Sequence, residues 1–570
     1  MSASASTTAT SVTTARLSQA SREEARSGAL GRTLVIAIMS LTVLVGFGFR
    51  ATRLSAEGLS EDELNKLRAV EEYRAKGLSS ANGEHPMLMK AMLTASVVAC
   101  ERWNASALAR DQASLEVPIE TALRLPGAIL GALTSLLIFF VVAELFGTPT
   151  ALVAAALWAC DPQAIGFNRI AKEDTFFLFF FLLANVFWLR GQRAAETGAR
   201  RPDLFYHATA VCLGAMMASK YLPHLFAISG AYYWVFQGIP STRWRMGKKK
   251  WLIFFAVATA AFVVFNPTIL LPGTWHEMRI FAGEHRIGHD SYEFMGRLYG
   301  NQMTLWLKGS PWYFYYAFIA FKLPPAIIIA FLVGLPVLFM RRLGDGRYFI
   351  LFWLFFWFFP FMLLGGKFTR YFTFALPAVL ITAAIGAHFI ASRLARLFAN
   401  ENARNYAHAA AALLVIMLSA YASIEAGPHP RLYTNALGGG TAHVGHYFPH
   451  DEFYDASTPD VATTVARLVR PGAQVASETP ELFDYYARRA GRVDLANVSL
   501  SDRAATSQLS IGDAIIVARG RRYFSNDALV HRLEAASQPA ATLALGGVPS
   551  TKVFVLDEAA LAAIKSDGDR

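Results

Sequence analysis

The chain has 570 residues, of which 54% are hydrophobic and only 17% are charged. Soluble globular proteins usually carry about 25% charged residues, so this composition excludes an ordinary soluble enzyme and indicates a polytopic membrane protein. The formal net charge of +11 does not require a nucleic-acid partner, because Lys and Arg concentrate in the cytoplasmic loops of membrane proteins.

The N-terminal segment, residues 1–32, is rich in Ser, Thr and Ala, and we expect it to be a disordered cytoplasmic tail. The first apolar run, about 33–49, follows several arginines and has no cleavage site. This pattern is typical of a retained signal anchor. Three cysteines, Cys100, Cys160 and Cys212, lie in or near apolar segments without CxxC spacing, which predicts buried thiols rather than a disulfide framework.

Apolar runs recur over residues 33–424 and predict about eleven transmembrane helices. Basic stretches then fall on alternate connections, which is what the positive-inside rule requires of a single topology with the N-terminus inside. These stretches are 190–203, 238–251, 340–347 and 391–407. We therefore expect an all-α membrane domain whose large loops, 50–125 and 272–322, lie outside the cytoplasm.

After about residue 425 the composition becomes that of a soluble protein. The stretches GAQVASE and DAIIVARG predict strands, and ELFDYYARR and NDALVHRLEAA predict helices. Residues 425–570 are therefore expected to form a small extracytoplasmic α/β domain.

Polar segments gather on the outer membrane face under this topology. The clearest is FNRIAKEDTFFLFFFLL, residues 167–183, in which a charge cluster abuts an apolar run. The others are SEDEL (60–64), GEHPMLMK (83–90), SKYLPH (219–224), the 272–322 loop and GGKFTRY (365–371). Together they predict a site at the outer edge of the bilayer.

Ordinary structural roles could also explain individual residues. Ser60 could cap a helix, with Glu63 completing a capping box. Arg169 and Lys172 could be interfacial anchors that extend their charges toward the headgroups. Asp174 suits a helix N-terminus electrostatically.

The order of these motifs resembles the GT-C superfamily of membrane glycosyltransferases. The resemblance is strongest to the protein O-mannosyltransferase branch, with the aminoarabinose-lipid A transferases as a second relative, and it covers roughly residues 30–425. The matching elements are Asp62-Glu63, GEHPMLMK, Arg124-Leu125-Pro126, NRIAKED, PWYFYYAFIAFKLP (311–324) and the Lys367, Arg370, Tyr371 set. The sequence departs from the family at Met87 and Met89, where the family has Pro and Gly.

The resemblance implies transfer of a mannose-like hexose or a pentose from a polyprenyl-phosphate carrier to a hydroxyl on a protein, glycan or lipid, with inversion. Asp62 would be the general base, and Glu63 would orient the site or act as base if the register shifts by one. Candidates for the donor phosphate are Lys90, Arg169, Lys367 and Arg370, with Arg279, Arg286 and Arg297 in reserve. Candidates for the sugar or acceptor are Glu84, His85, Asp174, His289, Trp312 and Tyr313.

Other functions remain open from the sequence. A multi-span transporter of lipids or lipid-linked sugars would perform no covalent chemistry, but transporters usually place ionisable residues near mid-membrane. No cofactor is expected. A divalent metal is unsupported, although His285 with His289, or the stretch HVGHYFPHDE (443–452), has suitable side chains. We expect a bacterial inner-membrane protein with its site in the periplasm, and an endoplasmic reticulum protein would share this topology.

Overall fold

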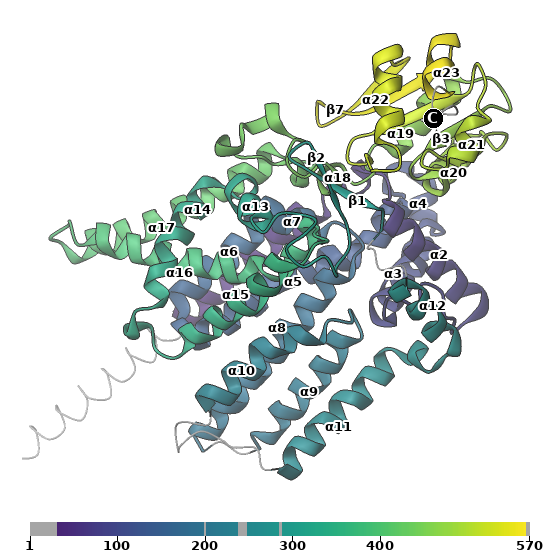
Figure 1. The fold of residues 1–570 in the computed structure, drawn as a ribbon. Helices are drawn as coiled ribbons and strands as arrows, with labels where there is room; N and C mark the ends of the chain where they lie inside the picture. Colours follow the sequence, from purple (N-terminus) through teal and green to yellow (C-terminus); the bar gives the residue numbers. More distant parts are fainter. Residues whose placement is uncertain (1–30, 199–200, 238–247, 284–287, 566–570) are drawn as a thin grey trace, which may run out of the picture.

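The computed structural model describes residues 31–198, 201–237, 248–283 and 288–565. Most of the predicted N-terminal tail, Arg286 and His285 therefore lie outside the described residues. Long helices form one end of the molecule, and a small unit with a β-sheet forms the other (Figure 1). The predicted fold class, an all-α membrane part followed by a small α/β unit, is confirmed.

Six helices of the described chain are long and apolar enough to cross a membrane, or seven if one bent pair counts as a span. They are Gly31–Ala56, α5 (Ile119–Phe146), α8 (Glu173–Glu196), α15 (Gly346–Leu363), α16 (Leu376–Ala395) and α17 (Glu401–Glu425). The bent pair is α6 (Thr148–Cys160) with α7 (Pro162–Asn168), at 61°. The protein is thus a multi-pass membrane protein.

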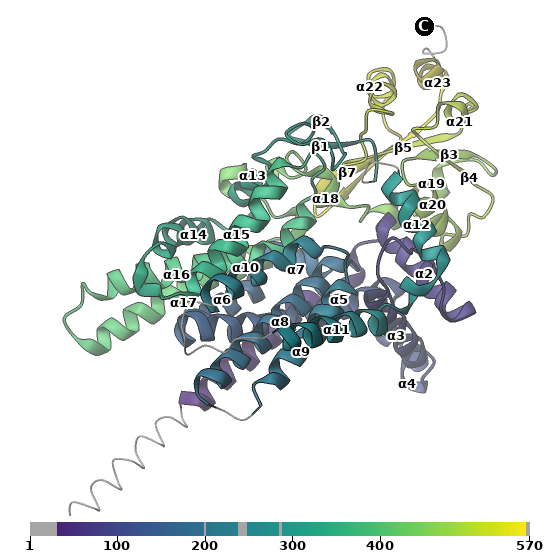
Figure 2. The same cartoon turned by 60° about the horizontal axis from the view of Figure 1, so that its bottom comes forward.

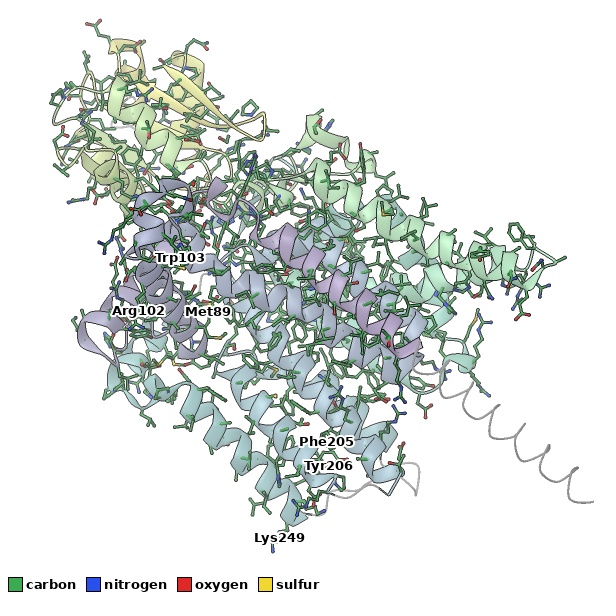
Figure 3. The ribbon with its side chains drawn as sticks, turned by 180° about the vertical axis from the view of Figure 1, so that it is seen from behind. Met89, Arg102, Trp103, Phe205, Tyr206 and Lys249 are labelled. Carbon is green, nitrogen blue, oxygen red and sulfur yellow. The ribbon has the colours of Figure 1, made fainter. Side chains whose placement is uncertain are left out.

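The remaining predicted spans coincide with shorter or less apolar helices. These are α9 (Asp203–Met217), α10 (Phe226–Gln237), α11 (Lys248–Phe265) and α14 (Pro325–Leu338). Each of the eleven predicted runs therefore contains a helix, while the number of true spans stays a prediction. Phe205, Tyr206 and Lys249 lie at the end of the bundle opposite Met89, Arg102 and Trp103 (Figure 3).

Close helix packing in the membrane part depends on small residues. Gly386 on α16 faces α14, where an added Cβ would come 1.9 Å from the carbonyl oxygen of Ala330. Gly334 on α14 makes the reciprocal contact, with the carbonyl oxygen of Thr382 2.0 Å from the position of an added Cβ. Small residues let membrane helices approach this closely. The three cysteines are free and buried, as predicted.

The end of the membrane part that lies next to the α/β unit carries short elements between the spans. Helices α2 (Glu61–Lys76), α3 (Met87–Asn104) and α4 (Ala107–Asp111) follow the first span, and α12 (Pro272–Gly283), the hairpin of β1 (Ser291–Phe294) with β2 (Arg297–Gly300) and α13 (Phe314–Lys322) follow α11. A connecting segment, residues 426–457, then leads to the sheet and contains α18 (Pro449–Phe453).

The α/β unit, residues 458–565, has a five-stranded sheet in the order β4-β3-β5-β7-β6. Strands β3, β4 and β5 are parallel, and β7 is antiparallel to both β5 and β6. The strands are β3 (Gln474–Ser477), β4 (Ala496–Ser499), β5 (Ala514–Ala518), β6 (Ala541–Leu545) and β7 (Val548–Val555). The helices are α19 (Thr458–Leu468), α20 (Pro480–Arg489), α21 (Arg503–Ser507), α22 (Asp527–Ala536) and α23 (Glu558–Lys565). All four secondary-structure predictions for this region are confirmed.

Alternation along the strands divides the core of this unit into two layers. Ala514 and Ile516 of β5 belong to a cluster that includes residues of α19 and α20, whereas Ile515 belongs to a cluster with residues of α22 and α23. Successive side chains of a strand point to opposite faces. The first cluster also contains residues of α2, α3 and α5, so this face of the sheet packs on the membrane part (Figure 2).

One buried ion pair joins the start of α5 to the start of α2. The Arg124 guanidinium donates to both carboxylate oxygens of Glu63, at 2.8 and 2.7 Å, and the two side chains are 4% and 1% exposed. Its remaining N–H groups donate to the carbonyl oxygens of Leu54, Glu57 and Gly58. All five guanidinium donors are therefore used.

Replacing Arg124 by Met should strongly destabilise the protein, because it leaves Glu63 buried without a counter-charge. Loss of one partner of a buried pair typically costs about 3–5 kcal/mol. Melting of the detergent-solubilised protein, followed by intrinsic fluorescence, would show the loss. Adding Glu63→Gln should restore part of it.

The matched control is Arg488→Ala, which breaks the exposed pair between Arg488 and Asp484. Exposed pairs contribute little to stability, so the melting temperature should stay the same. Equal effects of the two substitutions would contradict a special role for the buried pair.

Candidate active site

A cavity of about 650 Å³ lies between the membrane part and the α/β unit. Its walls come from α2, the loop before α3, the start of α8, the 219–222 turn, α12, the β1 hairpin, the 368–371 turn, the connecting segment and the chain after β5. Of the predicted site residues, six line it: Asp62, Glu84, His85, Asp174, His289 and Arg370. Tyr371, which belongs to one of the resembling motifs, lines it as well.

Asp62 stands in the first turn of α2 and faces this cavity. Its Oδ2 lies 2.7 Å from Nζ of Lys172 and 3.8 Å from a guanidinium nitrogen of Arg370, and it accepts a hydrogen bond of 2.5 Å from the Tyr454 hydroxyl. Burial would raise the pKa of Asp62, but Lys172 and Arg370 outweigh it and hold the pKa well below the ordinary value. Asp62 is therefore ionised at neutral pH.

Glu63, the neighbour of Asp62, does not line the cavity. Besides Arg124, its carboxylate accepts the N–H of Ala171 at 2.9 Å and that of Ser60 at 3.0 Å. The Ser60 hydroxyl accepts the N–H of Glu63 in return, so the capping box expected from the sequence is present. The Glu63 carboxylate thus stabilises the start of α2 and the loop before it.

Two acid–cation pairs and one contact with a neutral histidine involve acids that line the cavity. Glu173 lies 2.8 Å from Lys66, and both side chains are 1% exposed. Asp174 lies 2.5 Å from Nζ of Lys220, while its Oδ2 has no hydrogen-bond partner among the described residues. His85 lies 3.5 Å from Glu173, and burial lowers the pKa of His85 well below its ordinary value, so it is neutral at pH 7.

The α/β unit supplies the side of the cavity that faces away from the membrane part. Arg521, which follows β5, donates to His289 at 2.9 Å and to Glu61 at 3.1 Å. The ring of Tyr523 stacks on His289 with centroids 4.1 Å apart. Burial alone would raise the pKa of Glu61, but His289 and Arg521 lower it to about 2.

Several predicted site residues lie elsewhere. Lys90 donates to the carbonyl oxygens of Ala81 and Asn82 at 3.0 and 2.7 Å, and burial lowers its pKa to about 7. Lys367 donates to the carbonyl oxygens of Ser310 and Leu364. Neither ammonium lines the cavity.

Arg169 donates to the carbonyl oxygens of Thr52 and Arg53 at 2.6 and 2.8 Å and lines a different cavity, between the first span and α17. Trp312 and Tyr313 are 58% and 38% exposed and also lie outside the main cavity. Arg279 and Arg297, the reserve candidates for the donor phosphate, do not line the main cavity either.

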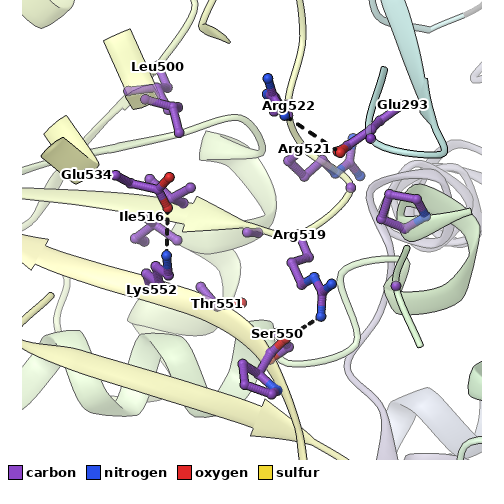
Figure 4. A pocket seen from close by; sticks show the side chains of 18 of the residues that line it. Glu293, Leu500, Ile516, Arg519, Arg521, Arg522, Glu534, Ser550, Thr551 and Lys552 are labelled. Carbon is purple, nitrogen blue, oxygen red and sulfur yellow. Dashed lines mark hydrogen bonds and ion pairs between the residues drawn. The ribbon is translucent and has the colours of Figure 1, made fainter. Parts of the chain in front are cut away.

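A further cavity, of about 410 Å³, lies between the β1 hairpin and the α/β sheet (Figure 4). Its charges largely pair with each other, Lys552 with Glu534 at 2.8 Å and Arg522 with Glu293 at 3.8 Å, while Arg519 donates to a backbone carbonyl. It contains none of the residues that the sequence predicted for the site.

Sequence reasoning missed roles for several residues that do line the cavity. Lys172 and Glu173 belong to the charge cluster in residues 167–183, and Lys220 belongs to SKYLPH. None of the three is among the predicted site residues. Tyr454, Arg521 and Tyr523 lie in the tail. Arg521 and Tyr523 follow closely after the predicted strand DAIIVARG, whereas no sequence signal points to Tyr454. Among the described residues, no group of three or more His, Cys, Asp or Glu could hold a metal ion.

Comparisons with known proteins agree with this architecture. Residues 113–270 match the family model described as dolichyl-phosphate-mannose-protein mannosyltransferase. No curated protein sequence matches the chain. The structure is similar to the apo oligosaccharyltransferase of Archaeoglobus fulgidus, with a TM-score of 0.52 and 12% identity over 85% of this chain and 69% of that one.

Two other solved structures show weaker similarity. ArnT from Cupriavidus metallidurans bound to undecaprenyl phosphate has a TM-score of 0.47 and 12% identity, covering 91% of this chain and 98% of that one. The S. cerevisiae Pmt1-Pmt2 complex bound to the sugar donor has a TM-score of 0.31 and 18% identity, covering 45% and 33%. The resemblance to the GT-C superfamily of membrane glycosyltransferases is confirmed by the family model and by the fold shared with the oligosaccharyltransferase.

Proposed function

We propose that the protein is an inverting glycosyltransferase that takes a sugar from a polyprenyl-phosphate carrier and transfers it to an acceptor hydroxyl outside the cytoplasm. The observation that carries the proposal is the ionised Asp62, held beside Lys172 and Arg370 in a cavity at the edge of the membrane part. The family model, whose description names a dolichyl-phosphate-mannose donor, supports a lipid-phosphate carrier and a mannose-like sugar.

Asp62 is the general base of this proposal. A hydroxyl is a poor nucleophile at neutral pH and needs a base within hydrogen-bond reach. The acceptor hydroxyl gives its proton to Asp62 while its oxygen forms a bond to the anomeric carbon. The bond from that carbon to the phosphate oxygen breaks on the opposite side, and the electron pair leaves with the phosphate.

Lys172 and Arg370 stabilise the leaving phosphate. Before reaction both cations lie near Oδ2 of Asp62, at 2.7 and 3.8 Å. Proton transfer neutralises this carboxylate, so the attraction of the two cations becomes available to the phosphate as its negative charge grows. Preorganised charges of this kind stabilise a transition state more than a ground state.

The sugar would lie over Asp174, Glu84 and His85, which line the same cavity. The Oδ2 of Asp174 has no partner among the described residues, and a sugar hydroxyl would provide the missing donor. The assay described below distinguishes a protein, a glycan and a lipid as the acceptor. We place the site in the periplasm of a bacterial inner membrane, following the topology expected from the sequence.

Replacing Asp62 by Asn should lower kcat by about 10²–10⁴-fold, because it removes the general base. The assay follows a radiolabelled sugar from polyprenyl-phosphate donors to a panel of peptide, glycan and lipid acceptors, with the protein in nanodiscs. Asp484→Asn, an exposed acid in the α/β unit, is the matched control and should keep wild-type turnover.

Two results would argue against this assignment. Unchanged turnover in Asp62→Asn would place the base elsewhere. Tight donor binding by the wild type without transfer to any acceptor would favour a transporter of lipid-linked sugars.

The Lys172→Met variant should move the acid limb of the kcat/KM profile to higher pH. Lys172 makes the largest contribution that lowers the pKa of Asp62, so the pKa of Asp62 is higher without it. The base is then protonated, and the rate is lost, at a higher pH than in the wild type. Lys552→Met, an exposed lysine of β7, serves as control, and an acid limb that stays in place would refute the coupling.

A further inference from the structure

We propose that Tyr454 and Asp455 of the connecting segment, clamped by Arg521 of the α/β unit, position Asp62 for proton transfer. This inference rests on the proposed function, in which Asp62 is the base. It gives the soluble part of the chain a direct role at the reaction centre.

Tyr454 contacts the reactive carboxylate directly. Its hydroxyl donates to Oδ2 of Asp62 at 2.5 Å, and its side chain is only 5% exposed. Two cations, Arg431 and Arg370, lie over its ring at 5.3 and 5.8 Å from the centroid and hold the ring in place. Burial and the nearby Asp62 keep the pKa of Tyr454 well above its ordinary value, so its hydroxyl remains a donor.

The two carboxylate oxygens of Asp62 differ in their neighbours. Tyr454, Lys172 and Arg370 all approach Oδ2. The described residues place no hydrogen bond on Oδ1. The geometry therefore assigns Oδ1 as the oxygen that takes the proton of the acceptor hydroxyl, while Oδ2 is fixed by its three neighbours.

The backbone at this contact is strained. Tyr454 and Asp455 have φ of 44° and 62°, two consecutive residues with side chains in the left-handed region. Such a residue is conformationally unfavourable and persists only where surrounding contacts hold it. Such strain clusters at functional sites. In this conformation the Tyr454 side chain contacts Asp62, and the Asp455 side chain contacts the backbone of Glu61.

Arg521 holds this conformation. Its guanidinium donates to both oxygens of Asp455, one bond being 2.7 Å, and the two side chains are 6% and 3% exposed. Asp455 in turn accepts the N–H of Glu61 at 3.2 Å, so its carboxylate lies at the N-terminus of α2. A negative charge is favourable at that position, and it fixes the turn of helix that carries Asp62.

The test begins with Tyr454→Phe, which removes only the hydroxyl. Its loss should lower kcat by about ten- to a hundredfold, the typical effect of one hydrogen bond to a charged group, with the donor KM unchanged. Because the bond favours the ionised carboxylate, its loss should also move the acid limb of the pH profile upward. Tyr447→Phe removes a tyrosine hydroxyl bond elsewhere in the connecting segment and should change neither quantity.

Arg521→Lys tests the clamp while keeping the positive charge. Lys cannot form the forked pair with Asp455, so we expect a lowered kcat with the same upward movement of the acid limb. Melting temperatures of all variants identify any that fail to fold.

A readout without turnover separates this inference from the proposed function. Infrared difference spectra against pH follow carboxyl protonation, and Asp62→Asn identifies the band of Asp62. A higher pKa in Tyr454→Phe supports the positioning role even if no acceptor is found. An unchanged pKa and unchanged kcat would overturn it, while loss of activity in Asp62→Asn would still support the glycosyltransferase.

Discussion

Arg124 on α5 and Glu63 on α2 form a buried ion pair that fixes the geometry of the membrane part where it meets the α/β unit. Removing two charges from water is costly, and the cost is met only where every donor and acceptor is satisfied. Here the three remaining guanidinium contacts are carbonyl oxygens at the end of the first span and in the loop that follows it. The first span, α5 and α2 are thereby tied together at one point.

This anchoring separates the roles of two adjacent acids. Successive residues of an α-helix point about 100° apart, so the helix turn that buries Glu63 against Arg124 directs Asp62 toward the cavity. Lys172, just before α8, then meets Asp62, and Lys66 one helical turn further along α2 meets Glu173. Lys172 and Arg370, which come from two other elements, thus keep Asp62 ionised in this cavity.

The sequence was informative where the physical signal is local. Apolar run length located all eleven helices, the stretches GAQVASE and DAIIVARG located β3 and β5, and the Ser60–Glu63 spacing indicated the capping box that the structure contains. It also placed Asp62, Asp174 and Arg370 at one site. It could not assign the other cations, because a lysine that faces a ligand and one that faces carbonyl oxygens look alike in a sequence. Lys90 and Lys367 are of the second kind.

Contacts distant in sequence were beyond prediction altogether. Tyr454 and Arg521 meet α2 across separations of 392 and 460 residues, without any periodic pattern. Their position follows from how the α/β unit docks: Tyr486 of α20 donates to Glu120 on α5 and accepts the N–H of Leu59 just before α2. The docking contacts therefore converge on the same two helices that the Arg124–Glu63 pair joins. The α/β unit and the membrane part therefore share both the contacts that fix α2 and the cavity that Asp62 faces.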